Sequence, residues 1–232
     1  LEAEYQRARE LLDRDLGLDP SRVTVVPGNH DLYTRGALES RRFEAYLGPY
    51  LASDLPELAV DVGGGRFPVV KLRGELVILG LSSAVPRPPF VAAGELGEIQ
   101  LAALGRALAH PEVARRTTVI ALHHPAVDDR TGLRARVQGL RDASGLVDQL
   151  RPLAAGLLLH GHLHRRAQRN LAGRTGVLQV GATSASLDHD DPDRMAGFNL
   201  YTLEPGAAPR VEAHVYSPSD GSFHVESVPK QV

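Results

Sequence analysis

Three segments of the chain share a pattern that restricts the possible folds: a short apolar run followed within two residues by a histidine-containing motif. The runs, which we predict to be buried β-strands, cover residues 23–26, 117–122 and 156–159. The motifs that follow them are Gly28-Asn29-His30-Asp31, His123-His124-Pro125 and His160-Gly161-His162-Leu163-His164. Because ligand sites in α/β sheets form at the carboxyl ends of strands, we expect these histidines to meet at one sheet edge.

The rest of the chain alternates helical and extended patterns early and is rich in strands late. Apolar spacing of 4, 3, 4 and 4 residues predicts an amphipathic helix from Leu1 to Leu16. We further predict helices at 40–47, 96–108 and 143–150, a hairpin of 69–72 with 76–81, a polar loop at 126–141, and late strands at 177–180, 198–203, 211–216 and 222–228. This order predicts an α/β domain with mixed sheets, and without a linker we expect one domain over 1–232.

Charge and composition exclude several classes of protein. The 26 Lys and Arg residues nearly balance 28 Asp and Glu residues, which gives a net charge of −2, so we expect no stable binding of nucleic acid. No cysteine is present, which excludes thiolate zinc sites and cysteine nucleophiles. The longest apolar run, 153–159, is far shorter than the roughly 20 residues of a membrane span, so we expect no membrane partner and a cytoplasmic location.

The histidine motifs together indicate a metal centre. Neutral imidazole is a common ligand of divalent transition metals. In an extended chain, His162 and His164 would project to the same side, because side chains alternate with period two. Each motif alone is explained by a turn or by an ordinary histidine at the end of a strand, but the three in this order are not.

The motifs at residues 28–31, 123–125 and 161–164 resemble those of the calcineurin-like metallophosphoesterase superfamily, and in particular its bacterial phosphodiesterase branch. Residues 94–104 are also similar to the segment that precedes the His-His-Pro strand in that branch. The resemblance implies a four-layer α/β/β/α sandwich of two mixed sheets with helices outside. It also implies hydrolysis of a small phosphoester, a diester rather than a monoester.

The resemblance implies a role for each matching residue. Asn29, His123 and His162 would bind one metal ion, and His164 would reach a second. His30 would be the general acid at the leaving group, with Asp31 orienting its ring. Two divalent ions, Mn²⁺, Fe²⁺ or Zn²⁺, would hold a bridging hydroxide that attacks phosphorus.

The sequence departs from the family pattern in one respect. The Asp-X-His and Gly-Asp motifs that the family carries upstream of Gly-Asn-His-Asp are missing, and with them the carboxylates that would offset two divalent charges. We expect the chain to be N-terminally truncated, which would leave an exposed sheet edge and an inactive fragment holding at most one weak metal. The alternatives are a degenerate, non-catalytic member that acts as an interaction scaffold, and a protein that binds a single metal.

Other candidate residues have simpler explanations. Asp188 to Asp193 could supply metal-binding carboxylates, but we expect a solvated acidic loop near the site. Arg134, Arg136 and Arg141 could contact a phosphate or nucleotide, although an exposed loop is the favoured interpretation. His124 and His160 are expected to be buried partners of the ligands.

Overall fold

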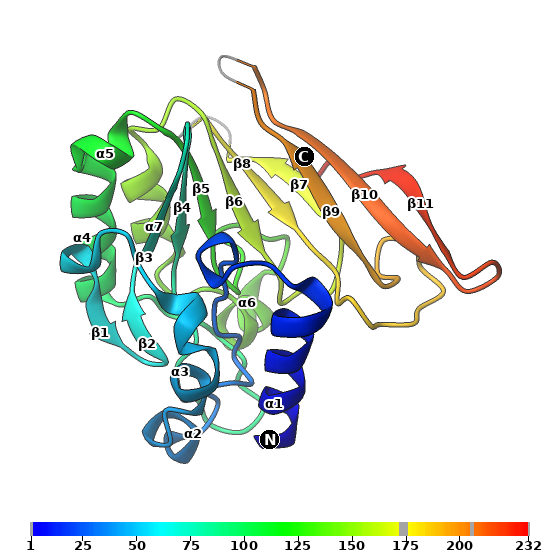
Figure 1. The fold of residues 1–232 in the computed structure, drawn as a ribbon, viewed down its shortest axis with the longest axis horizontal. Helices are drawn as coiled ribbons and strands as arrows, with labels where there is room; N and C mark the ends of the chain where they lie inside the picture. Colours follow the sequence, from blue (N-terminus) through cyan, green and yellow to red (C-terminus); the bar gives the residue numbers. More distant parts are fainter. Residues whose placement is uncertain (1, 172–175, 205–206, 232) are drawn as a thin grey trace.

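The computed structural model describes residues 2–171, 176–204 and 207–231, and its centre is a six-stranded mixed sheet of order β3-β4-β5-β6-β8-β7. The four strands from β4 to β8 run parallel, and β3 and β7 close the two edges as antiparallel neighbours. The strands are β3 (Val69–Arg73), β4 (Leu76–Gly80), β5 (Thr117–Ala121), β6 (Gly156–His160), β7 (Ala167–Asn170) and β8 (Val177–Gly181). The parallel strands β4, β5, β6 and β8 point toward the end of the molecule where α1, α3 and α6 lie, and β3 and β7 run the opposite way (Figure 1).

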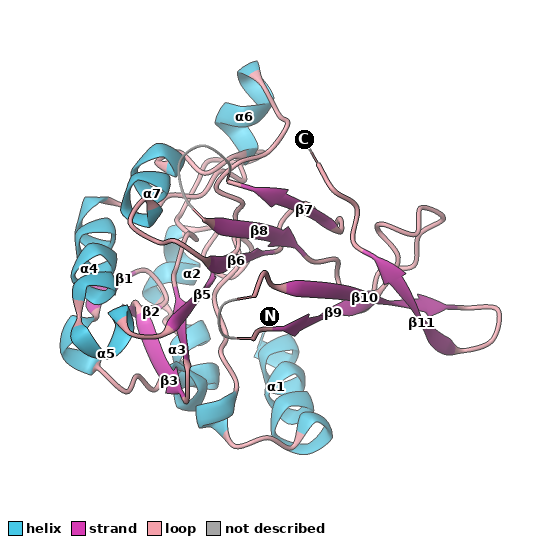
Figure 2. Cartoon of the chain, turned by 90° about the horizontal axis from the view of Figure 1, so that it is seen from above, coloured by secondary structure: helices cyan, strands magenta, loops and turns pink. Residues whose placement is uncertain are grey.

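One face of this sheet is covered by helices. They are α4 (Glu98–Ala109), α5 (Pro111–Ala114) and α7 (Ala143–Leu150), which lie together on one side of the sheet in Figure 2. Leu104, Leu146 and Leu150 are fully buried and pack on Leu79 and Ile120 of the sheet in the largest apolar cluster. Burial of apolar side chains of this size contributes about 1.5–3 kcal/mol each, so this interface holds the strands whose ends carry the histidines.

The opposite face is partly covered by a second, antiparallel sheet of three strands. Its strands are β9 (Gly197–Thr202), β10 (Arg210–Ser217) and β11 (Ser222–Ser227), in the order β11-β10-β9. Ala213 and Val215 of β10 pack on Val119, Leu157 and Val180 of the large sheet. Helices, mixed sheet and antiparallel sheet therefore form successive layers (Figure 2).

Residues 2–67 fold into short helices and a small hairpin, and the helices pack around a third cluster. Tyr5, Phe43 and Tyr50 are buried there. The elements are α1 (Glu2–Glu10), a π-helical turn (Leu11–Leu16), 3₁₀ turns (Pro20–Arg22, Gly48–Leu51 and Pro56–Leu58), α2 (Arg35–Glu39), α3 (Arg42–Leu47), β1 (Val60–Val62) and β2 (Gly65–Phe67).

The α/β class and most predicted elements are confirmed, but residues 23–26 are not part of a sheet in the described chain. This segment instead crosses the large sheet: a Cβ on Gly80 would lie 3.3 Å from both Thr24 Cγ2 and Val26 Cγ1. Buried Lys71 donates to the carbonyls of Pro20 and Val23, so a side chain rather than a neighbouring strand binds this backbone.

Three further differences concern local structure. The predicted loop at 126–141 contains helix α6 (Gly132–Gln138), and the three-stranded sheet is antiparallel throughout its described strands rather than mixed. Leu1, the first residue of the predicted N-terminal helix, lies outside the described residues. Among the helices that the structure describes, none combines the length and the apolar character needed to cross a membrane.

Candidate metal centre

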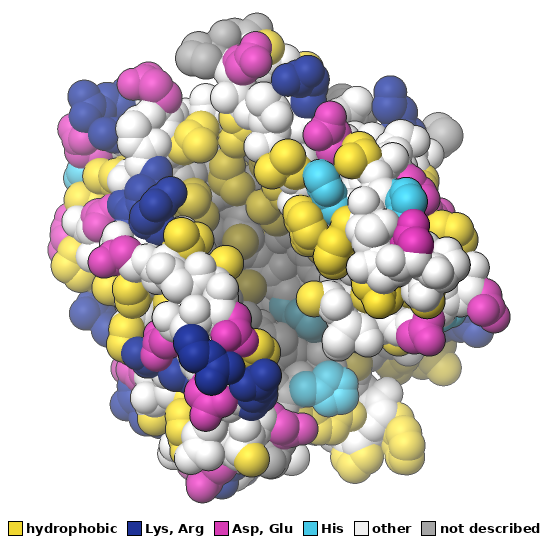
Figure 3. Space-filling model, turned by 45° about the vertical axis from the view of Figure 1, so that its right-hand side comes forward, with side chains coloured by type: hydrophobic (Ala, Val, Ile, Leu, Met, Phe, Trp, Pro, Cys, Tyr) yellow, Lys and Arg dark blue, Asp and Glu magenta, His cyan; other side chains and the backbone are white. Residues whose placement is uncertain are grey.

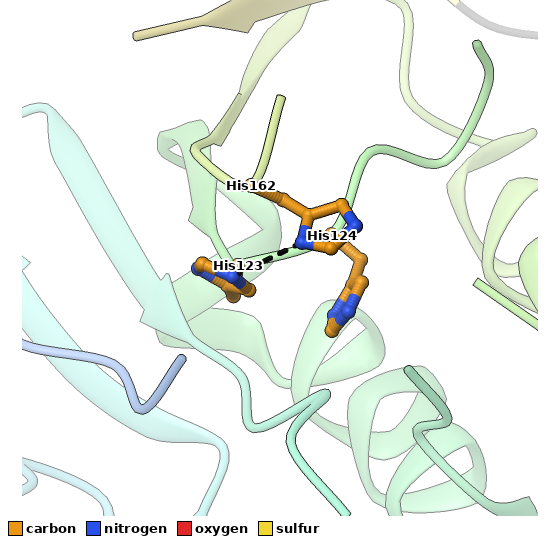
Figure 4. Close-up of side chains that lie close together, drawn as sticks. All are labelled: His123, His124 and His162. Atoms are coloured by element: carbon orange, nitrogen blue, oxygen red, sulfur yellow. Dashed lines mark hydrogen bonds between the residues drawn. The ribbon is translucent and has the colours of Figure 1, made fainter. Parts of the chain in front are cut away.

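Two neighbouring parallel strands bring histidines together at the carboxyl end of the large sheet. β5 and β6 pair in register from Thr118 to Ala121, and the ladder continues as Gly161 donates from its backbone to His123 O at 3.1 Å. The rings of His123 and His162 therefore face each other across adjacent strand ends, with centroids 5.1 Å apart (Figure 4). Pairing of two buried strands is thus what sets the spacing of these two imidazoles.

Three ligand atoms converge at this point. His123 Nε2 lies 2.8 Å from Asn29 Oδ1 and 3.3 Å from His162 Nδ1. Two ligand atoms that each lie about 2.1 Å from one metal ion, at bond angles near 90–109°, are about 3.0–3.4 Å apart. The two observed distances from His123 Nε2 are close to that spacing, so each neighbour is placed to share one divalent ion with His123.

The second ring nitrogen of His162 is held by the protein. Nε2 lies 2.8 Å from the carbonyl oxygen of Gln138, which can only accept, so the ring proton belongs on Nε2. This leaves the lone pair of Nδ1 directed at His123. A metal-binding histidine usually donates its other N–H to an oxygen in this way, because the bond fixes tautomer and ring orientation.

His124 lies beside the two rings and joins them in a group of three histidines that could hold a metal ion. It is fully buried, and each of its nitrogens is 2.9 Å from a protein oxygen: Nδ1 from Ser83 Oγ and Nε2 from Ala92 O. Because both nitrogens are already engaged, His124 is better suited to supporting the ligands than to binding the ion.

Glycines make room for the rings. A Cβ on Gly28 would lie 3.1 Å from His123 Cε1, and one on Gly161 would lie 3.6 Å from His123 Nδ1, so the ring is flanked by two residues without side chains. A Cβ on Gly94 would overlap the ring of His124 at 2.3 Å from Nδ1. Larger residues at 28 or 94 would displace the imidazoles.

Burial keeps these imidazoles uncharged. Burial, together with repulsion from the positive charges that His162, His164, His160 and His30 would carry, lowers the pKa of His123 to about 3. Burial likewise lowers the pKa of His162 to about 3, and that of His124 and His160 to about 4. At neutral pH the rings are neutral, which is the form that binds metals.

Asp31 closes the turn that presents Asn29. Its Oδ2 accepts the backbone N–H of Gly28 at 2.8 Å, and its own N–H donates to Gly28 O at 3.1 Å. Its Oδ1 accepts the hydroxyl of Tyr5 at 2.7 Å, which ties the turn to α1. Both carboxylate oxygens thus have partners, and neither partner is the ring of His30.

His30 and His164 stand at the open side of the site. Both are exposed, and His30 stacks on Tyr33 with ring centroids 6.0 Å apart. His162 and His164 have left-handed φ angles of 62° and 48°, so they do not project from an extended chain as the period-two spacing predicted. Such conformations cost about 1–3 kcal/mol each and are concentrated at functional sites.

The surroundings contain residues that the sequence did not single out. Arg130, which is paired with Asp128 at 2.5 Å, places Nη1 3.5 Å from His162 Nε2. Tyr5 contacts Asp31 through its hydroxyl and Gln138 contacts His162 through its backbone carbonyl, and no sequence motif marks either contact.

Asp191, from the predicted acidic loop, pairs with Arg165 at 3.1 Å. The molecule is hollowed on this side, with histidines in and beside the hollow (Figure 3).

Comparison with known proteins gives one informative match. No protein-family model matches the chain. The chain is 39% identical over 154 residues to a protein of Rhodococcus erythropolis named as a probable cyclic nucleotide phosphodiesterase. The match covers 66% of this chain and 43% of that protein, so this chain spans less than half of the relative's length.

Proposed function

We propose that this chain is part of a metal-dependent phosphodiesterase of the calcineurin-like superfamily. The observation that carries the proposal is the convergence of Asn29 Oδ1, His123 Nε2 and His162 Nδ1, which come from three distant segments. The relative's name supports hydrolysis of a phosphodiester. The helix–sheet–sheet order of layers is compatible with the four-layer sandwich of that superfamily.

The donor set fits one divalent ion better than two. Two imidazole nitrogens and an amide oxygen suit Zn²⁺, Mn²⁺ or Fe²⁺, and all three donors are neutral. Two ions bring a charge of +4, which Asn29, His123, His162 and His164 do not offset. A dinuclear centre would therefore need carboxylate ligands in addition to these four side chains.

The bound metal would polarise a phosphoryl oxygen and lower the pKa of a bound water. We assign the other tasks to the protein's own side chains. His162 is held in the ligating tautomer by Gln138, and His123 is held between Gly28 and Gly161. His30, exposed at the open side, is proposed to protonate the departing oxygen. Asp31 would assist by fixing the turn that carries His30.

The test is hydrolysis of bis(p-nitrophenyl) phosphate with Mn²⁺, Zn²⁺ or Fe²⁺, combined with metal binding measured by calorimetry. We expect one weakly bound ion, and we expect His123→Ala to abolish both binding and any hydrolysis. His224→Ala, at an exposed histidine of β11, is the matched control and should change neither. Unchanged metal binding in the His123 variant would refute the assignment, and two tightly bound ions would refute the charge argument.

A scaffold function is the second candidate, and one observation favours it. The outer face of the three-stranded sheet exposes apolar side chains that stack on one another, among them Phe198 and Phe223 with centroids 5.4 Å apart. Exposed apolar patches of this kind often mark interaction surfaces. A chain that binds no metal and cleaves no diester would favour the scaffold.

A further inference from the structure

A second cavity lies beside the histidine cluster and is rich in arginine. It has a volume of about 480 Å³ and lies between the segment after β5, helix α6, the segment after β6 and the loop before β9. Its lining includes Asp128, Asp129, Arg130, Arg134, Leu163, Arg165 and Arg194. With four arginines and two aspartates among all its lining residues, the cavity carries a net charge of +2.

The two aspartates of the cavity are already neutralised. Asp128 pairs with Arg130 at 2.5 Å, and its pKa is lowered through the hydrogen bonds and charge of that arginine despite its burial. Asp129 pairs with Arg169, which lies outside the cavity lining. Neither carboxylate is therefore free to compensate the remaining arginines.

Arg134 and Arg194 carry the uncompensated charge. In residues 2–171, 176–204 and 207–231, neither guanidinium has a hydrogen bond or an ion pair, whereas Arg165 is held by Asp191 at 3.1 Å. Two cationic side chains that face one cavity repel each other, and an anion between them removes that cost. A guanidinium can bind a phosphate through two parallel N–H groups.

The cavity is connected to the metal centre through shared residues. Arg130 lines the cavity and also reaches within 3.5 Å of His162 Nε2. Leu163, another lining residue, stands between His162 and His164 in the chain. The cavity therefore lies next to the Nε2 side of the His162 ring, and a ligand whose diester lies at the Nδ1 side would reach it around that ring.

We propose that Arg134 and Arg194 form a subsite for a second phosphate group of the substrate. The inference rests on the proposed phosphodiesterase function and narrows its substrate class to diesters with a further phosphate on one arm. A cyclic mononucleotide, which has a single phosphate, would leave this subsite without its ligand.

A matched pair of chromogenic substrates tests the subsite. Thymidine 5′-(p-nitrophenyl phosphate) and its 3′-phosphorylated form contain the same scissile diester and differ by one phosphate. With Mn²⁺ we expect kcat/KM at least about 10-fold higher for the phosphorylated form, because a guanidinium binds phosphate through charge-assisted hydrogen bonds. Arg134→Gln or Arg194→Gln should remove that preference and leave the unphosphorylated substrate unaffected.

Arg136→Gln is the control, because Arg136 is exposed on the same helix as Arg134 but does not line the cavity. An equal loss of preference in this variant, or no preference in the wild type, would overturn the proposal.

Binding of thymidine 3′,5′-bisphosphate and thymidine 5′-monophosphate to the metal-free protein, measured by calorimetry, gives a readout without catalysis. We expect the wild type to bind the bisphosphate about 10-fold more tightly and the Arg134 variant to lose this difference. If the protein binds no metal and cleaves neither chromogenic diester, the proposed function fails, while the ratio of these two affinities still decides the subsite.

Discussion

Replacement of His160 by Gln tests whether burial keeps the histidines of this site neutral. His160 is 7% exposed at the end of β6, and burial lowers its pKa to about 4. In the unfolded chain its pKa returns to about 6.5. The unfolded state therefore binds a proton below pH 6.5 that the folded state does not accept, so the stability present above pH 6.5 is lost as the pH falls.

The size of the effect follows from these two pKa values. Between pH 7.5 and pH 5.5 the unfolded histidine takes up close to one proton while the folded one stays neutral, which lowers the unfolding free energy by about 1.4 kcal/mol. The loss grows to roughly 3 kcal/mol as the pH approaches the folded pKa of about 4. His160→Gln should remove this contribution, so the pH dependence of its stability should be smaller by that amount.

The assay is urea unfolding at pH 7.5, 6.5 and 5.5, at constant ionic strength and with a chelator present. The readout is the fall in unfolding free energy with pH, which is insensitive to any constant destabilisation by the substitution. His224→Gln removes an exposed histidine of β11 that bonds to Asp220 at 2.9 Å, and it should not make the fall smaller. If His160→Gln also keeps it in full, the imidazole of His160 is not excluded from protonation in the folded protein and the reasoning is wrong.

Three further substitutions probe the site and the core. Gly28→Ala should weaken metal binding about 10-fold in calorimetry, because its Cβ would press on the ring of His123, whereas Gly48→Ala, where a Cβ meets nothing within 4 Å, should bind metal like the wild type. Leu104→Ala should lower the unfolding free energy by about 2–5 kcal/mol in urea titrations, and a loss under 1 kcal/mol would contradict its full burial. Tyr5→Phe should cost about 1–2 kcal/mol in the same assay through its lost bond to Asp31, and an unchanged midpoint would show that this bond adds nothing.

The sequence predicted that residues 123 and 162 would meet because the ends of parallel strands lie at the same sheet edge, whereas Asn29 reaches them from a segment that is not a strand. Buried strands are recognisable in a sequence as apolar runs, and the ends of β5 and β6 were predicted to within two residues. The same argument failed for 23–26, because an apolar run indicates burial and not a pairing partner. This segment is partly buried against the sheet without joining it.

Local geometry at the site was less predictable. The left-handed backbone of His162 and His164 comes from tertiary packing, since nothing in a His-X-His sequence distinguishes a turn from a strand. The bond from Tyr5 to Asp31 spans 26 residues and depends on how α1 packs, which periodicity cannot give. The roles of His30 and His164 remain predictions from the resemblance.

The atoms proposed to bind the metal are widely separated along the chain, by 94 residues from Asn29 to His123 and by 39 from His123 to His162. A cation that binds them acts as a crosslink between the N-terminal helical segment and two central strands. Such a cation is released when the whole protein unfolds and not when one end frays. The free energy of unfolding should therefore increase with the logarithm of the metal concentration above the dissociation constant. A melting-temperature series against added Mn²⁺ would thus measure occupancy of the centre without any substrate.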